Sequence, residues 1–146
     1  MGKSELRKAP LFGLLFKEMN IAVDRKSKSD GHRALGRVAE EIERGNSVYI
    51  FPEGTISNEG ILKNFKNGAF KVAIDKQVPI VPVTYISNWK ILQNGGFLKS
   101  YGSPGIARII IHEPVSTVGM TDENLVPLRD QLFELTRKTL EEFKQK

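Results

Sequence analysis

The segment SVYIFPEGTISNEG, residues 47–60, decides the fold because it joins a short apolar run to an abrupt stop. Residues 48–51 are almost continuously apolar, which is typical of a strand covered on both faces in a parallel sheet. Pro52 and Gly54 then end the strand. The segment therefore predicts a buried strand that delivers a carboxylate, a glycine and a hydroxyl at its carboxyl end: Glu53, Gly54 and Thr55.

Ligands in open α/β sheets bind outside the carboxyl ends of the strands, where loops are free to specialise. Gly54 lets backbone amides approach a ligand closely, and the hydroxyls of Thr55 and Ser57 suit phosphate or polyol oxygens. Glu53 is suited to accept a hydrogen bond from a ligand hydroxyl. Arg25 follows a second predicted strand, and its guanidinium matches phosphate in a bidentate way. We therefore expect Arg25 and Glu53 to face one phosphorylated ligand across neighbouring strand ends.

Helices and strands alternate along the rest of the chain. Apolar spacing predicts helices over residues 11–19, 30–44 and 68–76, and a last helix from Asp122 or Pro127 to Lys144. Strands are expected over residues 21–23, 48–51, 78–86 and 106–111, and residues 88–105 read as a loop or hairpin. This order predicts an α/β fold in which helices flank a partly parallel or mixed sheet, within a single domain of residues 1–146.

Composition restricts the possible functions. The chain has 146 residues, no cysteine and a net charge of +5, from 22 Lys and Arg against 17 Asp and Glu. The charge favours anionic partners such as phosphorylated small molecules, lipid headgroups or nucleic acid. The lack of cysteine excludes thiolate nucleophiles and Cys-based metal sites, and the wide separation of His32 and His112 argues against a histidine-rich one. No apolar run reaches the ~18 residues that a membrane-spanning helix needs.

Five segments, in order, resemble the lysophosphatidic acid acyltransferases of the glycerolipid acyltransferase superfamily. FPEGTIS at residues 51–57 is similar to that family's F-P-E-G-T-R-S block. FKNGAF at residues 65–70 is similar to its F-K-x-G-A-F, and VPIVPV at residues 78–83 to its V-P-I-V-P-V. Upstream, GKSELRKAPLFG at residues 2–13 resembles the segment around K-x-E-L, and NIAVDRKSKSDG at residues 20–31 resembles the block whose Arg follows a strand.

The resemblance implies a role for particular residues. Glu53, Gly54 and Arg25 would bind the glycerol-phosphate acceptor, Thr55 and Ser57 would support them, and Lys3 would lie beside the acceptor phosphate. Ile56 stands where the family usually has an arginine, so one expected phosphate contact is absent. The implied reaction transfers an acyl group from acyl-CoA or acyl carrier protein to lysophosphatidic acid, forming phosphatidic acid in phospholipid biosynthesis. The implied location is the cytoplasmic face of a membrane, with no cofactor required.

Family members also carry H-x-x-x-x-D, whose His acts as general base and whose Asp orients the imidazole. Neither histidine of this chain fits, because Arg37 stands five residues after His32 and Thr117 five residues after His112. We therefore assign no catalytic residue and no metal ligand. We expect the chain to correspond to the part downstream of this motif, to lack the family's N-terminal portion, and to have little activity alone.

Three other functions are open at the sequence level. A non-catalytic phosphate- or lipid-binding module at the membrane surface is motivated by the net charge and by the apolar residues 11–16. Nucleic-acid binding is disfavoured, because the basic residues are scattered among acidic ones and no recognition motif is present. A carboxylate hydrolase would need a second carboxylate beside Glu53, for which Asp24 is the plausible partner.

Overall fold

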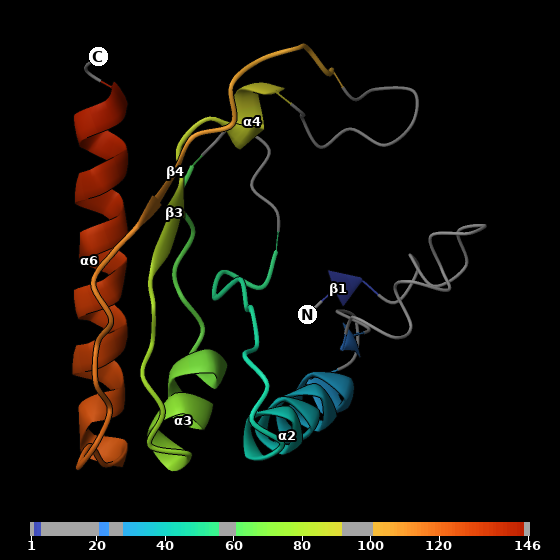
Figure 1. The fold of residues 1–146 in the computed structure, drawn as a ribbon, viewed down its shortest axis with the longest axis vertical. Coiled ribbons are helices and arrows are strands. Elements are labelled where there is room, and N and C mark those ends of the chain that lie inside the picture. Colours follow the sequence, from blue (N-terminus) through green and yellow to red (C-terminus); the bar gives the residue numbers. More distant parts are fainter. Residues whose placement is uncertain (1, 4–20, 24–27, 56–60, 92–100, 145–146) are drawn as a thin grey trace. The chain divides into compact units, whose positions relative to one another are not determined.

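The computed structural model describes residues 2–3, 21–23, 28–55, 61–91 and 101–144 (Figure 1). The helix predicted over residues 11–19 lies outside this set. The chain divides into two compact units, Met1–Pro52 and Glu53–Lys146, and each is described by itself. The prediction of a single domain over residues 1–146 stays a prediction.

The first unit contains a parallel strand pair and one long helix. Strand β1 (Gly2–Lys3) pairs in parallel with β2 (Ala22–Val23), and Lys3 stands opposite Val23 in the register. Helix α2 (Lys28–Glu43) follows, which confirms the helix predicted over residues 30–44. Gly45 ends it at a φ of 84°, and its amide donates to the Ile42 carbonyl at 2.9 Å.

The buried face of α2 is centred differently from the predicted one. The prediction named Leu35, Val38, Ala39 and Ile42, of which Val38 is fully buried and the others are half-buried. Ala34, one turn before Val38, is also fully buried. The apolar spacing located the correct side of the helix, but that side is most deeply buried at Ala34 and Val38.

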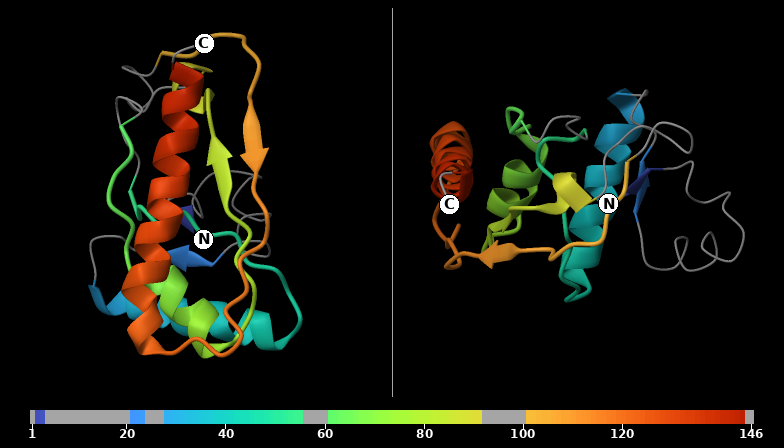
Figure 2. Two further views of the ribbon diagram at one scale, coloured as in Figure 1. Left: turned by 90° about the vertical axis from the view of Figure 1, so that its left-hand side faces the viewer. Right: turned by 90° about the horizontal axis from the view of Figure 1, so that it is seen from above.

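The second unit holds the remaining elements. They are α3 (Gly68–Asp75), β3 (Val83–Tyr85), α4 (Asn88–Ile91), β4 (Ile109–Ile111), the 3-10 helix η2 (Asp122–Asn124) and α6 (Leu125–Lys144). Strands β3 and β4 are antiparallel, and α6 lies along β3 and against α3 (Figure 2). The α/β class is confirmed: helices flank small sheets, one strand pair parallel and the other antiparallel.

Several element boundaries differ from the prediction, and the strand expected over residues 106–111 is regular only from Ile109 to Ile111. The strand expected from residue 78 becomes regular only at Val83, because Pro79 and Pro82 have no N–H to donate. Between these prolines, Ile80 forms an isolated bridge with Val115, with N···O distances of 2.9 and 2.8 Å. The start of the expected loop at residues 88–105 is instead a short helix, α4. Residues 92–100 of that segment lie outside the described part of the chain.

The core of the second unit is the packing of α3 against α6. Spacings of three and four residues place apolar side chains of α6 on one face, which buries them against α3. Five residues form this cluster: Phe70, Ile74, Leu125, Leu128 and Leu132. Half-buried side chains of Phe65, Ile80, Val115, Met120 and Leu135 surround it. The long helix predicted from residue 122 or 127 to residue 144 is therefore confirmed, with its predicted apolar face buried.

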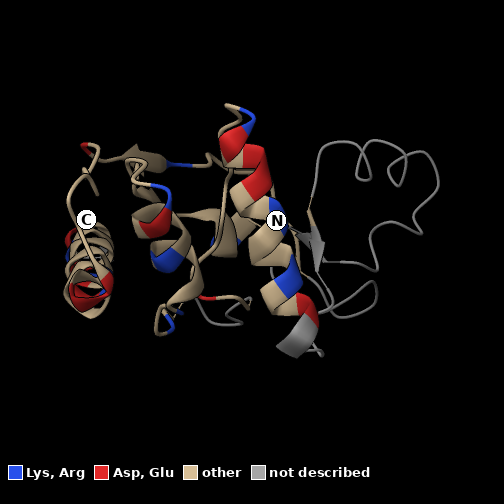
Figure 3. Ribbon diagram, turned by 90° about the horizontal axis from the view of Figure 1, so that it is seen from below, with Lys and Arg blue, Asp and Glu red and all other residues tan. Residues whose placement is uncertain are grey.

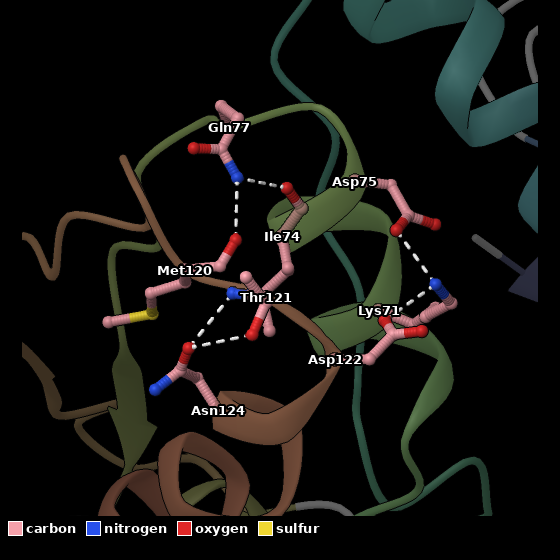
Figure 4. Close-up of polar contacts among 8 residues, drawn as sticks. All are labelled: Lys71, Ile74, Asp75, Gln77, Met120, Thr121, Asp122 and Asn124. Atoms are coloured by element: carbon pink, nitrogen blue, oxygen red, sulfur yellow. Dashed lines mark hydrogen bonds and ion pairs between the residues drawn. The ribbon is translucent and has the colours of Figure 1, made fainter.

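Polar contacts join the end of α3 to the chain that leads into α6 (Figure 4). The Lys71 ammonium lies 2.8 Å from Asp75 and 2.7 Å from Asp122, and hydrogen bonds to these carboxylates raise its pKa. Gln77, held at a φ of 52°, donates from Nε2 to the carbonyls of Ile74 (2.6 Å) and Met120 (3.0 Å). These contacts connect α3 to the segment that leads into α6.

The described helices are amphipathic rather than wholly apolar. None of them combines the length with the apolar character that crossing a bilayer requires. Lys and Arg stand beside Asp and Glu along α2 (Figure 3), and α6 carries Arg137 between Glu134 and Glu141, with N···O distances of 2.7 and 2.6 Å. Opposite charges are thus interleaved along both long helices.

Candidate functional site

Residues 47–52, which precede the Glu53 turn, alternate in exposure like a strand but do not form one of the described strands. Exposure alternates from residue 47 to residue 52: Val48 and Ile50 are half-buried, whereas Tyr49 and Phe51 are 45% and 52% exposed. The rings of Tyr49 and Phe51 meet edge to face at 5.1 Å, as expected when residues i and i+2 share a face. The prediction of a strand buried on both faces is therefore wrong, because one face of this segment is exposed.

The chain turns at Pro52 and Glu53 and passes through Gly54 at a φ of 66°. This left-handed conformation is unfavourable for residues with a Cβ, so the glycine is required by the backbone. Proline before the turn and glycine within it are the residues that such turns favour. The carboxylate–glycine–hydroxyl turn predicted from the sequence is present, although it follows an extended segment rather than a paired strand.

Glu53 is half-buried and is bonded to the backbone of the segment that begins at residue 61. Its Oε2 accepts a hydrogen bond from the backbone N–H of Lys63 at 2.9 Å, ten residues further along the chain. Sequence reasoning assigned this carboxylate to a ligand hydroxyl and missed the bond to the backbone. An ionised carboxylate has about four acceptor positions, so the Lys63 bond leaves it capacity for a ligand.

Lys66 covers Gly54, which no sequence argument had indicated. A Cβ built on Gly54 would lie 3.0 Å from Cδ, Cε and Nζ of Lys66. The absence of a side chain at Gly54 therefore lets the end of the lysine lie directly against the turn. Lys66 is the second residue of the FKNGAF segment, so the lysine itself is visible in the sequence. The direction in which its side chain points depends on the fold.

The two neighbours of Lys66 are attached to the second unit's helices. The Phe65 ring stacks on Phe70 of α3 at 6.1 Å and meets Phe133 of α6 edge to face at 5.3 Å. On the other side, Asn67 Oδ1 accepts a hydrogen bond from Arg129 of α6 at 2.8 Å. The backbone of Lys66 is thus positioned by aromatic packing on one side and a polar contact on the other.

The other predicted site residues are only partly described. Thr55 is exposed directly after the turn, while Arg25 and Ser57 lie outside the described residues. Lys3 ends β1 opposite Val23, so its backbone stands beside the strand that leads to Arg25. Carboxyl ends of parallel strands lie at the same edge, which is the arrangement expected if Lys3 and Arg25 serve one ligand. The meeting of Arg25 with Glu53 stays a prediction.

Neither histidine is arranged as a general base. His112 Nε2 lies 2.9 Å from the hydroxyl of Thr84, which is 2% exposed, and His32 is exposed on α2. Within the described part of the chain, no group of three or more potential ligand side chains is placed to hold a metal ion.

The model of one protein family, named Acyltransferase, matches residues 1–86. The chain belongs to the acyltransferase family. The match includes every predicted site residue and Lys66, and it ends directly after β3. The family match therefore includes both the Glu53–Gly54 turn and the segment that contains Lys66.

Several members of the acyltransferase family are similar in sequence to most of this chain. The 1-acyl-sn-glycerol-3-phosphate acyltransferase of Haemophilus influenzae is 32% identical over 97% of this chain and 58% of its own length. Acyltransferase alpha of Mus musculus is 33% identical over 77% of this chain and 39% of its own. The chloroplastic BAT2 of Brassica napus is 36% identical over 73% of this chain and 30% of its own.

A solved acyltransferase structure shares the fold. It is the 1-acyl-sn-glycerophosphate acyltransferase PlsC from Thermotoga maritima, with a TM-score of 0.80 and 30% identity. The likeness covers 99% of this chain and 56% of the Thermotoga chain. The chain thus spans between about a third and three fifths of the length of these relatives.

Proposed function

We propose that this chain forms the acceptor-binding part of a lysophosphatidic acid acyltransferase of phospholipid biosynthesis. The observation that carries the proposal is the Glu53–Gly54 turn, which lies inside the family match and has the left-handed glycine that a close approach of backbone to ligand requires. The relatives' names supply the acceptor, a 1-acyl-sn-glycerol 3-phosphate. Arg25, Lys3 and the hydroxyls of Thr55 and Ser57 complete the proposed acceptor site.

The proposed reaction joins the acceptor to an acyl thioester, either acyl-CoA or acyl carrier protein. The free acceptor hydroxyl attacks the thioester carbon, a C–O bond forms, the C–S bond breaks and the carrier thiol leaves. The proposed role of Glu53 is to orient the acceptor while its bond to Lys63 holds the loop. No cofactor enters this scheme, because the thioester itself supplies the activated acyl group.

The proton of the acceptor hydroxyl must pass to a base. This requirement limits the activity that the chain can have by itself. General-base catalysis typically contributes about 10²- to 10⁴-fold. Neither His32 nor His112 has an aspartate at the family's spacing, and His112 lies against Thr84. We therefore propose that the chain binds acceptor but has little or no activity by itself.

Calorimetric titration of the purified chain with 1-hexanoyl-lysophosphatidic acid, below its micelle concentration, tests the acceptor proposal. We expect saturable binding of this lipid and much weaker binding of 1-hexanoylglycerol, which has no phosphate. Arg25→Met should weaken binding of the phosphorylated lipid about tenfold or more, because charged hydrogen bonds are the stronger ones. Equal affinity for both lipids would contradict the proposal. An acyl-transfer assay, with Thermotoga PlsC as positive control, should show no robust turnover.

The alternative is a non-catalytic phosphate- or lipid-binding module at the membrane surface, favoured by the net charge of +5. The two functions differ in their need for an acyl donor. If the chain belongs to a transferase, a non-hydrolysable acyl-CoA analogue should bind it with measurable affinity. A chain that binds lysophosphatidic acid but no acyl donor would favour the module.

A further inference from the structure

The position of Lys66 relative to Gly54 carries an inference about how this chain holds the acceptor's charge. The side chain of Lys66 is exposed at the turn, and its last three heavy atoms lie against the glycine. An ammonium group has three donors and suits a phosphate as a compact positive charge. None of the ion pairs among the described residues involves Lys66, so its charge is not committed to a described carboxylate.

Contacts of the neighbouring residues restrict where the side chain of Lys66 can lie. Phe65 is held between aromatic rings of α3 and α6, and Asn67 is held by Arg129. A backbone fixed on both sides limits the region that the four-carbon side chain can reach. That region includes the turn at Gly54, because the glycine has no Cβ to block it.

The FPEGTIS segment lacks a cation that the related family block contains. Ile56 occupies the position at which an arginine is usual, two residues after Gly54. We propose that Lys66 binds the phosphate of the acceptor at the Gly54 turn, in a chain whose Ile56 supplies no positive charge. This inference rests on the proposed function and adds the residue on which acceptor recognition in this chain depends.

A purely structural role for Lys66 makes a different prediction. Lysine stems often cover apolar or backbone surface while the charged end stays in water. In that case the methylene groups would matter for stability and the charge would not. Lys66→Met keeps most of the stem and removes the charge, so it separates the two roles.

The test measures binding of 1-hexanoyl-lysophosphatidic acid and the thermal unfolding temperature for each variant of the full chain. We expect Lys66→Met to weaken binding about tenfold with little change in unfolding temperature, since a charged hydrogen bond is lost. Lys66→Arg should keep most of the affinity. Lys138→Met, on the exposed side of α6, is the matched control and should bind like the unaltered chain.

A rescue experiment adds a second readout. Ile56→Arg combined with Lys66→Met should restore most of the lost affinity if both positions serve the same phosphate. Unaltered affinity in Lys66→Met would overturn the inference while leaving the acceptor proposal intact. Failure of the unaltered chain to bind the phosphorylated lipid would overturn both, and lower stability of Lys66→Met without weaker binding would assign Lys66 a structural role.

Discussion

At the scale of single residues, the site depends on a glycine whose backbone and whose missing side chain both matter. The φ of 66° at Gly54 disfavours residues with a side chain, and a Cβ there would lie 3.0 Å from the flexible end of Lys66, which would have to shift. Gly36 in α2 provides a contrast, because a Cβ there would meet nothing within 4 Å. The two glycines thus differ both in backbone conformation and in their surroundings.

Gly54→Ala should therefore destabilise the protein and Gly36→Ala should not. The left-handed conformation costs a residue with a Cβ about 1–2 kcal/mol, and Lys66 must also move. In the helix interior, alanine is favoured over glycine by about 0.5–1 kcal/mol, so Gly36→Ala should stabilise slightly. Urea denaturation of the two variants measures both changes. Equal stabilities for the two would contradict the role assigned to Gly54.

At the scale of elements, α6 contributes three of the five side chains in the core cluster of the second unit. Leu128 and Leu132 are 2% and 3% exposed and lie against α3, whereas Val126 on the same helix is 46% exposed. The helix therefore stabilises the unit through one narrow face. Its other side carries the ion pairs of Arg137.

Leu128→Ala should lower the free energy of unfolding by about 2–5 kcal/mol, because it removes buried methyl groups and leaves a cavity. Val126→Ala is the control, and as a mostly exposed position it should change stability by no more than about 0.5 kcal/mol. Denaturant titration of both variants provides the comparison. A small effect at Leu128 would mean that α6 contributes less to the core than its burial indicates.

The ion pairs on the outer face of α6 predict a pH dependence. The hydrogen bond from Arg137 holds the pKa of Glu134 below the ordinary value of a glutamate. The pair's contribution to stability is therefore complete above the unfolded pKa and is lost as the pH falls through the folded pKa. The contribution is small, because both side chains are exposed.

Glu134→Gln tests this dependence. The variant should be slightly less stable than the unaltered chain at neutral pH, and the difference should disappear in acid. Glu142→Gln, an exposed neighbour on the same helix, serves as control and should show a smaller difference at neutral pH. Thermal unfolding followed from neutral pH into acid measures it. A difference that grows on acidification would contradict the assigned sign.

At the scale of the whole molecule, the net charge of +5 predicts attraction to anionic surfaces. The charges are interleaved along the long helices (Figure 3), so we expect a diffuse and weak attraction. Sedimentation with vesicles containing phosphatidylserine should recover part of the protein at low salt. Recovery should fall at 0.5 M salt, because the Debye length of about 10 Å at 0.1 M shortens further. No binding at low salt would contradict the proposed membrane-surface partner.

Periodicity predicted the long helices well, because an amphipathic pattern over many residues has few alternative structures. It predicted the short extended segments less well. Residues 48–51 are apolar enough for a strand covered on both faces, yet Tyr49 and Phe51 are largely exposed. A strand depends on what pairs with it and covers it, and those partners are distant in the sequence.

The sequence by itself determined helices α2, α3 and α6, the turn at Pro52 to Gly54 and the membership of the acyltransferase family. These depend on local backbone preferences and on ordered blocks of residues, which are readable along one chain. Only the tertiary structure decided that Lys66 lies over Gly54 and that Glu53 holds the amide of Lys63. Packing of Phe65 between α3 and α6 helps to position that lysine, and no local pattern specifies such packing.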